Sequence, residues 1–202
     1  MRRPTADPTS RVVLATGVLA AVLAVGLGAA LHGHVGDTRL DVALGTPVIR
    51  LFARHRATVV GLANLGGPET IALLAVLLAA VLGARGRWTG AAAVVLAPAV
   101  TGLLTQYVLK PVVDRPLNTE PSWPSGHAGG TWALATVVVV LLLREGCTRV
   151  RVVDSAAVLV VAVVNAVGLV GAQYHFTTDV LGGAAVGVAA GCATCLALRV
   201  AR

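Results

Sequence analysis

Long runs of apolar residues, separated by short polar segments, constrain the fold of this chain more than any other feature. They cover residues 12–31, 71–83, 91–109, 127–143, 152–170 and 176–198. About 20 apolar residues let a helix cross the hydrocarbon core of a bilayer, where only helices and closed barrels satisfy all their backbone hydrogen bonds. The sequence therefore predicts an all-α, polytopic membrane protein with six transmembrane helices. The run 71–83 is short for a span, so its helix can reach back into residues 59–65.

Composition supports the membrane class and argues against nucleic acid as a partner. Only 12% of the residues are charged and 56% are hydrophobic, whereas soluble domains carry about 25% charged residues. The formal charge of +7 comes from short basic clusters between the apolar runs and not from one basic face. The cysteines Cys147, Cys192 and Cys195 lie at or within apolar segments without metal-ligand spacing. They are expected to be buried small hydrophobes.

The chain is interpreted as one membrane domain, residues 12–198, between cytoplasmic tails at residues 1–11 and 199–202. A secretory signal has a similar basic start, but its apolar region is only about 7–15 residues. We therefore expect a retained first helix, with a cleaved signal as the alternative. Residues 32–68 mix charged and apolar side chains at helical spacing, which predicts an amphipathic segment on the outer membrane surface. A loop with one short helix is the alternative.

The placement of arginines predicts the orientation of the chain. With a cytoplasmic amino terminus and six crossings, most arginines fall inside, as the positive-inside rule requires. The exceptions lie in the amphipathic segment and in the loop 110–126, where anionic ligands or headgroups give a local reason for positive charge. High usage of Ala, Val, Gly and Arg is typical of a GC-rich bacterium. The expected location is the bacterial inner (plasma) membrane.

Three polar fragments stand at the predicted outer ends of the helices. The first supplies the cations Lys110 and Arg115 within the loop 110–126, and the second, residues 125–127, places Ser-Gly-His at the start of an apolar run. The third holds His175 and Asp179, which are four residues apart and so share one helical face. Cations, a serine-glycine turn, two histidines and a carboxylate suit the handling of a phosphate ester by covalent catalysis on histidine.

Each fragment also has a non-catalytic interpretation. Ser125 and Gly126 can simply begin a helix, and histidines at a membrane interface can be satisfied by carbonyls. Asp179 is harder to explain in this way, because a charge inside an apolar transmembrane helix costs about 2.5–3.5 kcal/mol. It needs a partner, and His175 is adjacent. Two histidines and a carboxylate can also bind zinc or iron, but the nearby cations would repel a metal, so neither metal nor cofactor is predicted.

These motifs resemble those of the membrane type 2 phosphatidic acid phosphatases, also called PAP2 or lipid phosphate phosphatases, which are related in their site to vanadium haloperoxidases. The resemblance rests on Pro-Ser-Gly-His at residues 124–127 and on His175-x-x-x-Asp179 followed by residues 180–183. It covers roughly residues 110–191, and the pattern of six spans extends it over most of the chain. The family implies a metal-independent phosphatase with a helical core.

The resemblance also implies a role for each site residue. His175 would attack phosphorus, Asp179 would orient its ring, and His127 would protonate the departing alcohol oxygen as general acid. The residues implied to bind the substrate phosphate are Lys110, Arg115, Ser125 and Gly126.

Two positions depart from the family pattern. The first motif usually has Arg-Pro after six intervening residues, and Leu117 stands at the expected arginine. The third motif usually has an arginine six residues before its histidine, and Leu169 stands there. Arg115, Asn118, Gln173 or an arginine of the amphipathic segment could take the place of the absent arginines. The departures motivate an alternative function, a lipid-phosphate binding or transport protein that has lost hydrolysis.

Glycines continue the spacing of the third motif. Gly183, Gly187 and Gly191 follow His175 and Asp179 at intervals of four residues. They predict a close helix contact that holds the histidine rigidly, or ordinary packing between membrane helices.

The predicted substrate is a membrane lipid phosphate, because a site at the helix ends can receive a headgroup while the tails stay in the bilayer. Polyprenyl phosphates or diphosphates, phosphatidic acid, phosphatidylglycerol phosphate and polyprenyl-linked sugar phosphates all fit this description. The sequence is compatible with a homo-oligomer.

Overall fold

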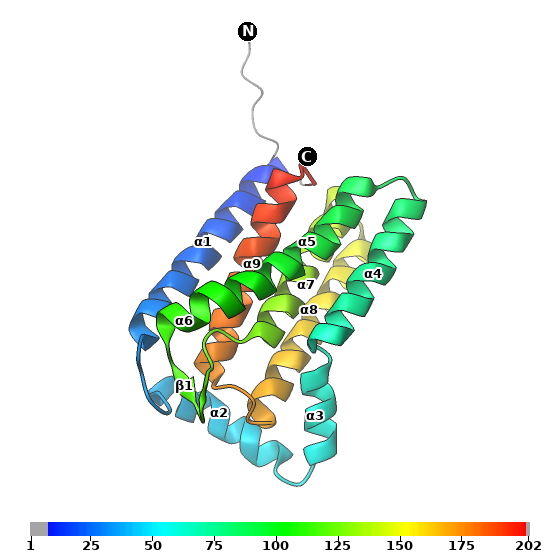
Figure 1. Cartoon of the computed structure of the whole chain (residues 1–202). Helices are drawn as coiled ribbons and strands as arrows, with labels where there is room; N and C mark the ends of the chain where they lie inside the picture. Colours follow the sequence, from blue (N-terminus) through cyan, green and yellow to red (C-terminus); the bar gives the residue numbers. More distant parts are fainter. Residues whose placement is uncertain (1–7, 201–202) are drawn as a thin grey trace.

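Helices run the length of the molecule in the computed structural model, which describes residues 8–200. The long ones are α1 (Pro8–Leu31), α4 (Pro68–Ala84), α5 (Trp88–Leu104), α7 (Gly126–Arg144), α8 (Arg149–Gly171) and α9 (Thr177–Ala197). In Figure 1, α9 lies beside α1 and α7, and both ends of the described chain are at the same end of the bundle. Five helices are long and apolar enough to cross a membrane, and a bent pair provides a sixth span. The prediction of an all-α membrane bundle is confirmed.

The sixth span is made of α3 (Arg56–Asn64) and α4, which meet at an angle of 45°. Gly66 and Gly67 form the break, and Pro68 begins α4 at a position where its missing N–H leaves no hydrogen bond unmade. The short apolar run 71–83 does therefore reach back towards residues 59–65. Before the bend, the end of α3 packs against α8, where Asn165 donates hydrogen bonds to the Leu62 and Ala63 carbonyls. After the bend, α4 packs against α5 and α7.

The span that begins with α5 extends further than the sequence predicts. It continues through a π-helical turn, η1 (Thr105–Leu109), into α6 (Lys110–Val113). Lys110 thus lies on the last helical turn and not in a loop, and the loop begins at Asp114, which adopts a left-handed conformation with φ +48°. The sequence signal for a stop was Pro111. A π turn adds one residue to the helical repeat, and it is a recognised way to carry a helix through an irregular region.

The packing of α9 on α7 is close enough to exclude side chains at two glycines. A Cβ atom added at Gly183 would overlap the Ser125 carbonyl oxygen, and one added at Gly187 would overlap the Gly129 carbonyl oxygen. Both neighbours are backbone atoms of α7 or its cap, which cannot turn away. The glycine stripe is therefore a helix-packing surface, and at Gly183 this surface touches the second predicted motif.

One end of the bundle carries the irregular segments. There α2 (Arg39–Phe52) lies across the helix ends, close to a two-stranded hairpin of β1 (Pro116–Leu117) and β2 (Glu120–Pro121) (Figure 1). The predicted amphipathic segment is thus two helices, α2 across the bundle end and α3 within the bent pair.

The cysteines are divided between the core and the surface. Cys192 and Cys195 are buried among α1, α5, α7 and α9, as predicted. Cys147 is exposed, contrary to the prediction. It follows Gly146, whose φ of +108° turns the chain between α7 and α8, so it belongs to a surface turn.

Candidate active site

The three predicted fragments meet at the bundle end that carries α2. The His127 and His175 rings lie with their centroids 6.5 Å apart and their planes tilted by 57°. Lys110, Gly126, His127 and His175 all line one cavity of about 750 Å³, here called the apolar cavity. The structure therefore brings together four of the seven predicted site residues around one space.

Ser125 supports this arrangement from behind the cavity. It is fully buried, and its Oγ accepts the Ala128 N–H at 3.3 Å, which caps the start of α7. Its own N–H donates to the Asp179 carbonyl at 3.0 Å and joins the second fragment to the third. The side chain thus has the helix-initiating role that the sequence offered as the alternative to phosphate binding.

His175 and Asp179 lie at the start of α9 as a facing pair. The distance from His175 Nδ1 to Asp179 Oδ2 is 3.7 Å, longer than a hydrogen bond, although catalytic hydrogen bonds are often long before substrate binds. Asp179 Oδ2 also accepts the Phe176 N–H at 3.3 Å. Asp179 is fully buried, so the carboxylate has a fixed position from which it can orient the ring.

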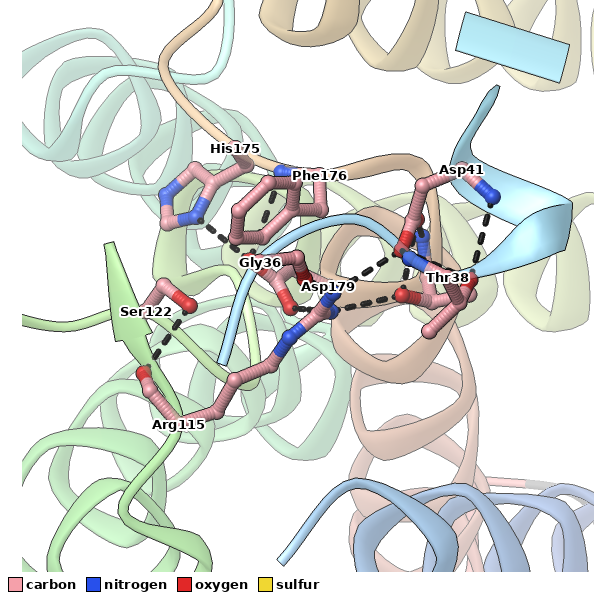
Figure 2. Close-up of polar contacts among 9 residues, drawn as sticks. Gly36, Thr38, Asp41, Arg115, Ser122, His175, Phe176 and Asp179 are labelled. Atoms are coloured by element: carbon pink, nitrogen blue, oxygen red, sulfur yellow. Dashed lines mark hydrogen bonds and ion pairs between the residues drawn. The ribbon is translucent and has the colours of Figure 1, made fainter. Parts of the chain in front are cut away.

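Arg115 occupies a different place from the one predicted. Its side chain is fully buried, and Figure 2 shows the guanidinium between two carboxylates. Nη1 donates to Asp179 Oδ1 at 2.6 Å, and Nη2 donates to Asp41 Oδ2 at 2.8 Å. The guanidinium carbon also lies 4.1 Å from the centre of the Phe176 ring. With these partners, Arg115 holds the protein together around Asp179, and it does not line the apolar cavity.

Asp41 is the residue that sequence reasoning missed. It lies in the first turn of α2, where Thr38 and Asp41 form a capping box. The Thr178 N–H and hydroxyl donate to Asp41 Oδ1 at 2.7 and 2.8 Å. Burial alone would raise the pKa of Asp41, but the hydrogen bonds from Thr178, Thr38 and Arg115 outweigh it and lower the pKa from 3.8 to about 2. The Thr-x-x-Asp pattern was a detectable cap signal, but nothing in it pointed to Arg115.

His175 stands between two cavities of opposite character. The apolar cavity extends from His175 between α4 and α5, along a wall formed largely by Ile71, Ala72, Ala75, Val76, Val95, Pro98, Ala99 and Leu103. A second space of about 350 Å³, the polar cavity, lies towards α2 and includes Asp37, Asp41, Asn118, Gln173 and Thr177. Among the residues that line either space in the described chain, Lys110 is the one lysine or arginine.

Comparison with known proteins identifies the family. The PAP2 superfamily matches residues 42–201 of the chain. The chain belongs to the PAP2 superfamily. A solved structure with the same fold is that of the first transmembrane PAP2-type phosphatidylglycerolphosphate phosphatase from Bacillus subtilis. It superposes with a TM-score of 0.71 at 22% identity, over 89% of this chain and 94% of that one. No curated protein matches the chain.

The two departures from the PAP2 pattern have different surroundings. Leu169 is fully buried and packs with Val59 and Ala63 of α3, so an arginine there would place a charge among apolar side chains. Leu117 lines the polar cavity beside Asn118. Of the candidates to replace the absent arginines, Asn118 and Gln173 lie at this cavity, whereas Arg115 is held by its carboxylates.

Among the described residues, the site offers no constellation suited to a metal ion. Within residues 8–200, no group of three or more His, Cys, Asp or Glu side chains is placed to hold one. Asp179 is engaged by Arg115 and the Phe176 N–H, while His127 and Lys110 share the cavity wall. This donor set suits an anion.

Proposed function

We propose that this protein is an integral-membrane lipid phosphatase that hydrolyses a phosphomonoester or diphosphate of a lipid through a phosphohistidine. The observation that carries the proposal is the apolar cavity, which is hydrophobic along α4 and α5 and ends at Lys110, His127 and His175. Ligand sites are typically concave and apolar with a few convergent polar groups. A lipid tail matches the wall, and a phosphate matches the polar end.

The chemistry follows from the two histidines. The His175 nitrogen that does not face Asp179 attacks phosphorus, and the bond from phosphorus to the lipid oxygen breaks. His127 donates a proton to that oxygen, so the lipid leaves as a neutral alcohol or as a lipid monophosphate. His127 then removes a proton from water, the water oxygen bonds to phosphorus, and the N–P bond breaks to release inorganic phosphate. Asp179 keeps the ring oriented and stabilises its positive charge.

Anion binding in this scheme relies on Lys110 and on the start of α7. Lys110 reaches the cavity from α6, and Gly126 places the first backbone amides of α7 at the same wall. Free N–H groups and the helix dipole favour a phosphate at a helix amino terminus. The expected assignments are therefore Lys110 and Gly126 for phosphate contact, with Ser125 acting through the cap.

The substrate class proposed is a polyprenyl-linked or glycerolipid phosphate in a bacterial inner membrane. The start of α7, the end of α8 and the start of α9 lie at the same end of the bundle as α2. The arginine pattern of the sequence favours the outer face of the membrane for this end. The reaction as drawn uses no metal.

A second candidate, a PAP2-fold protein that binds lipid phosphate without hydrolysing it, is favoured by one observation. Lys110 is the one lysine or arginine at the two cavities within residues 8–200, whereas charge stabilisation in phosphoryl transfer generally uses several cationic groups. The loss of cations would slow chemistry more than binding.

Phosphate release in detergent separates the two functions. Wild type, His175→Ala and a surface control, His55→Ala, are assayed on a panel of lipid phosphates with a chelator present. His55 is exposed and its side chain does not cap α3, so this control should keep wild-type rates. Loss of release in His175→Ala alone supports the phosphatase. Equal release by all three preparations contradicts it, and binding without release by the wild type supports the second candidate.

A further inference from the structure

Two buried ion pairs link α2 to the carboxylate that faces His175. Asp41 contacts Arg115, Arg115 contacts Asp179, and the Asp179 carboxylate faces His175 at 3.7 Å. All three members of the ion-paired chain are buried. Asp41 lies just outside the segment matched by the PAP2 superfamily, which begins at residue 42. We infer that Asp41 is a positioning residue for His175, acting through Arg115 and Asp179. The inference rests on the proposed phosphatase function.

The geometry fixes Arg115 from several sides. Nη1 donates to both Asp179 Oδ1 and the Thr178 hydroxyl at 2.6 Å. Nη2 donates to Asp41 Oδ2 at 2.8 Å and to the Gly36 carbonyl at 2.9 Å. Asp41 in turn accepts the Thr178 backbone N–H and hydroxyl. The network therefore holds the first turn of α9 at two residues, Thr178 through Asp41 and Asp179 through Arg115.

The net charge of Asp41, Arg115 and Asp179 together determines how strongly this network stabilises positive charge on His175. Two carboxylates share one guanidinium, so the buried group carries one net negative charge. Because Asp41 takes part of the positive charge of Arg115, Asp179 keeps negative charge to stabilise the imidazolium or phosphorylated ring. Without Asp41, the whole charge of Arg115 would act on Asp179. Interactions of this kind are strong because few water molecules screen them in a buried site.

A charge-restoring pair of variants distinguishes positioning from simple structural support. Asp41→Asn makes the network neutral, while the double variant Asp41→Asn/Arg115→Gln returns it to one net negative charge. We expect kcat to fall about 10- to 100-fold in the single variant, the range for losing an outer partner of a functional side chain. The double variant should recover to within about tenfold of wild type. A purely structural network would instead be harmed more by losing two of its members.

Asp37→Asn is the matched control. Asp37 lines the same polar cavity, but it is exposed and has no ion pair or hydrogen bond among the contacts of residues 8–200. This variant removes the same charge close to the same space, so it should keep kcat near the wild-type value. A loss equal to that of Asp41→Asn would show a general field effect and overturn the inference.

The pH dependence of kcat/KM gives a second readout that a change in folding does not move. Charged and titratable groups around His175 and its cavities are Asp37, Asp41, Asp179, Lys110, His127, Arg115 and the nearby Arg56 and Glu69. In Asp41→Asn the removal of negative charge should shift the acid limb of the profile to lower pH. The double variant should shift it back.

The outcomes are decided on folded, detergent-purified protein with kcat and KM measured separately. Wild-type kcat in Asp41→Asn, or a double variant worse than the single, overturns the inference. If the single variant does not fold, the double variant decides: a kcat less than tenfold below wild type supports the inference, and a larger loss overturns it. Phosphate release by wild type that is lost in His175→Ala keeps the proposed function standing in either case.

Discussion

The contact of Gly183 with the start of α7 predicts a large effect from the smallest possible side chain. In Gly183→Ala, the new Cβ would overlap the Ser125 carbonyl oxygen and lie 3.1 Å from Ala128 Cβ and 3.2 Å from the Gly129 N atom, where ordinary contact begins at 3.4 Å. These atoms belong to the cap and first turn of α7. They cannot rotate away, so α9 must move from α7 by about 1 Å, a displacement that can lower a catalysed rate about 100-fold.

The effect on stability should be smaller than the effect on rate. Overpacking a close contact typically costs about 1–3 kcal/mol, which a folded membrane bundle can tolerate. Asp179 lies in the first turn of α9, about one turn before Gly183, and His175 directly precedes this helix. His127 is on α7, so the shift separates the two histidines. We expect kcat to fall about 100-fold with a modest decrease in the thermal midpoint.

The assay compares phosphate release and thermal midpoints for wild type, Gly183→Ala and Gly26→Ala. Gly26 lies in α1, and a Cβ there meets no atom within 4 Å, so alanine should be neutral or slightly stabilising, as expected for a helix interior. Equal rates in the two variants would refute the reasoning, because they would show that the α7–α9 distance does not set the geometry of the histidines.

Other predictions follow from the site. Lys110→Ala should raise KM and weaken inhibition by inorganic phosphate, while Lys110→Arg should recover part of both; unchanged inhibition would show that Lys110 does not contact phosphate. Arg115→Ala should lower the free energy of unfolding by about 3–5 kcal/mol, because it leaves two buried carboxylates without their cation. A stably folded variant in which only KM rises would show instead that Arg115 binds the substrate phosphate. The pKa of Asp41 is about 2 in the folded protein, against its ordinary value of 3.8. This lowered pKa adds about 2 kcal/mol to the free energy of unfolding above pH 3.8, and the contribution is lost as the pH falls towards 2. The stability difference between wild type and Asp41→Asn should therefore shrink over that range in acid-unfolding curves. Dialysis against a chelator should leave the rate of phosphate release unchanged, and recovery on adding a divalent ion would contradict the metal-free scheme.

Local patterns predicted the helices and the lysine and histidines at the polar end of the apolar cavity. Apolar runs long enough to span a bilayer can hardly form anything but helices, so the spans were readable from the sequence. Lys110, Gly126, His127 and His175 were also found, because polar residues at the ends of such runs are unusual enough to stand out.

The partners of Arg115 could not be predicted in the same way. Two carboxylates at positions 41 and 179 meet one guanidinium only after α2 folds across the bundle end. In the sequence, Asp41 was one of several charged residues in an amphipathic segment, and Arg115 looked like any cation near a phosphate motif. The continuation of the α5 span past Pro111 was missed for a related reason, since the π turn has no clear signal in residue type.

The position of His175 between an apolar and a polar space bears on how the two products leave the site. In the proposed hydrolysis, the dephosphorylated lipid remains with the hydrocarbon side and diffuses away in the plane of the bilayer. Inorganic phosphate is soluble only in water and leaves on the opposite side of the ring. Separate exits would let each product leave without waiting for the other, which would speed product release while leaving the equilibrium of the hydrolysis unchanged.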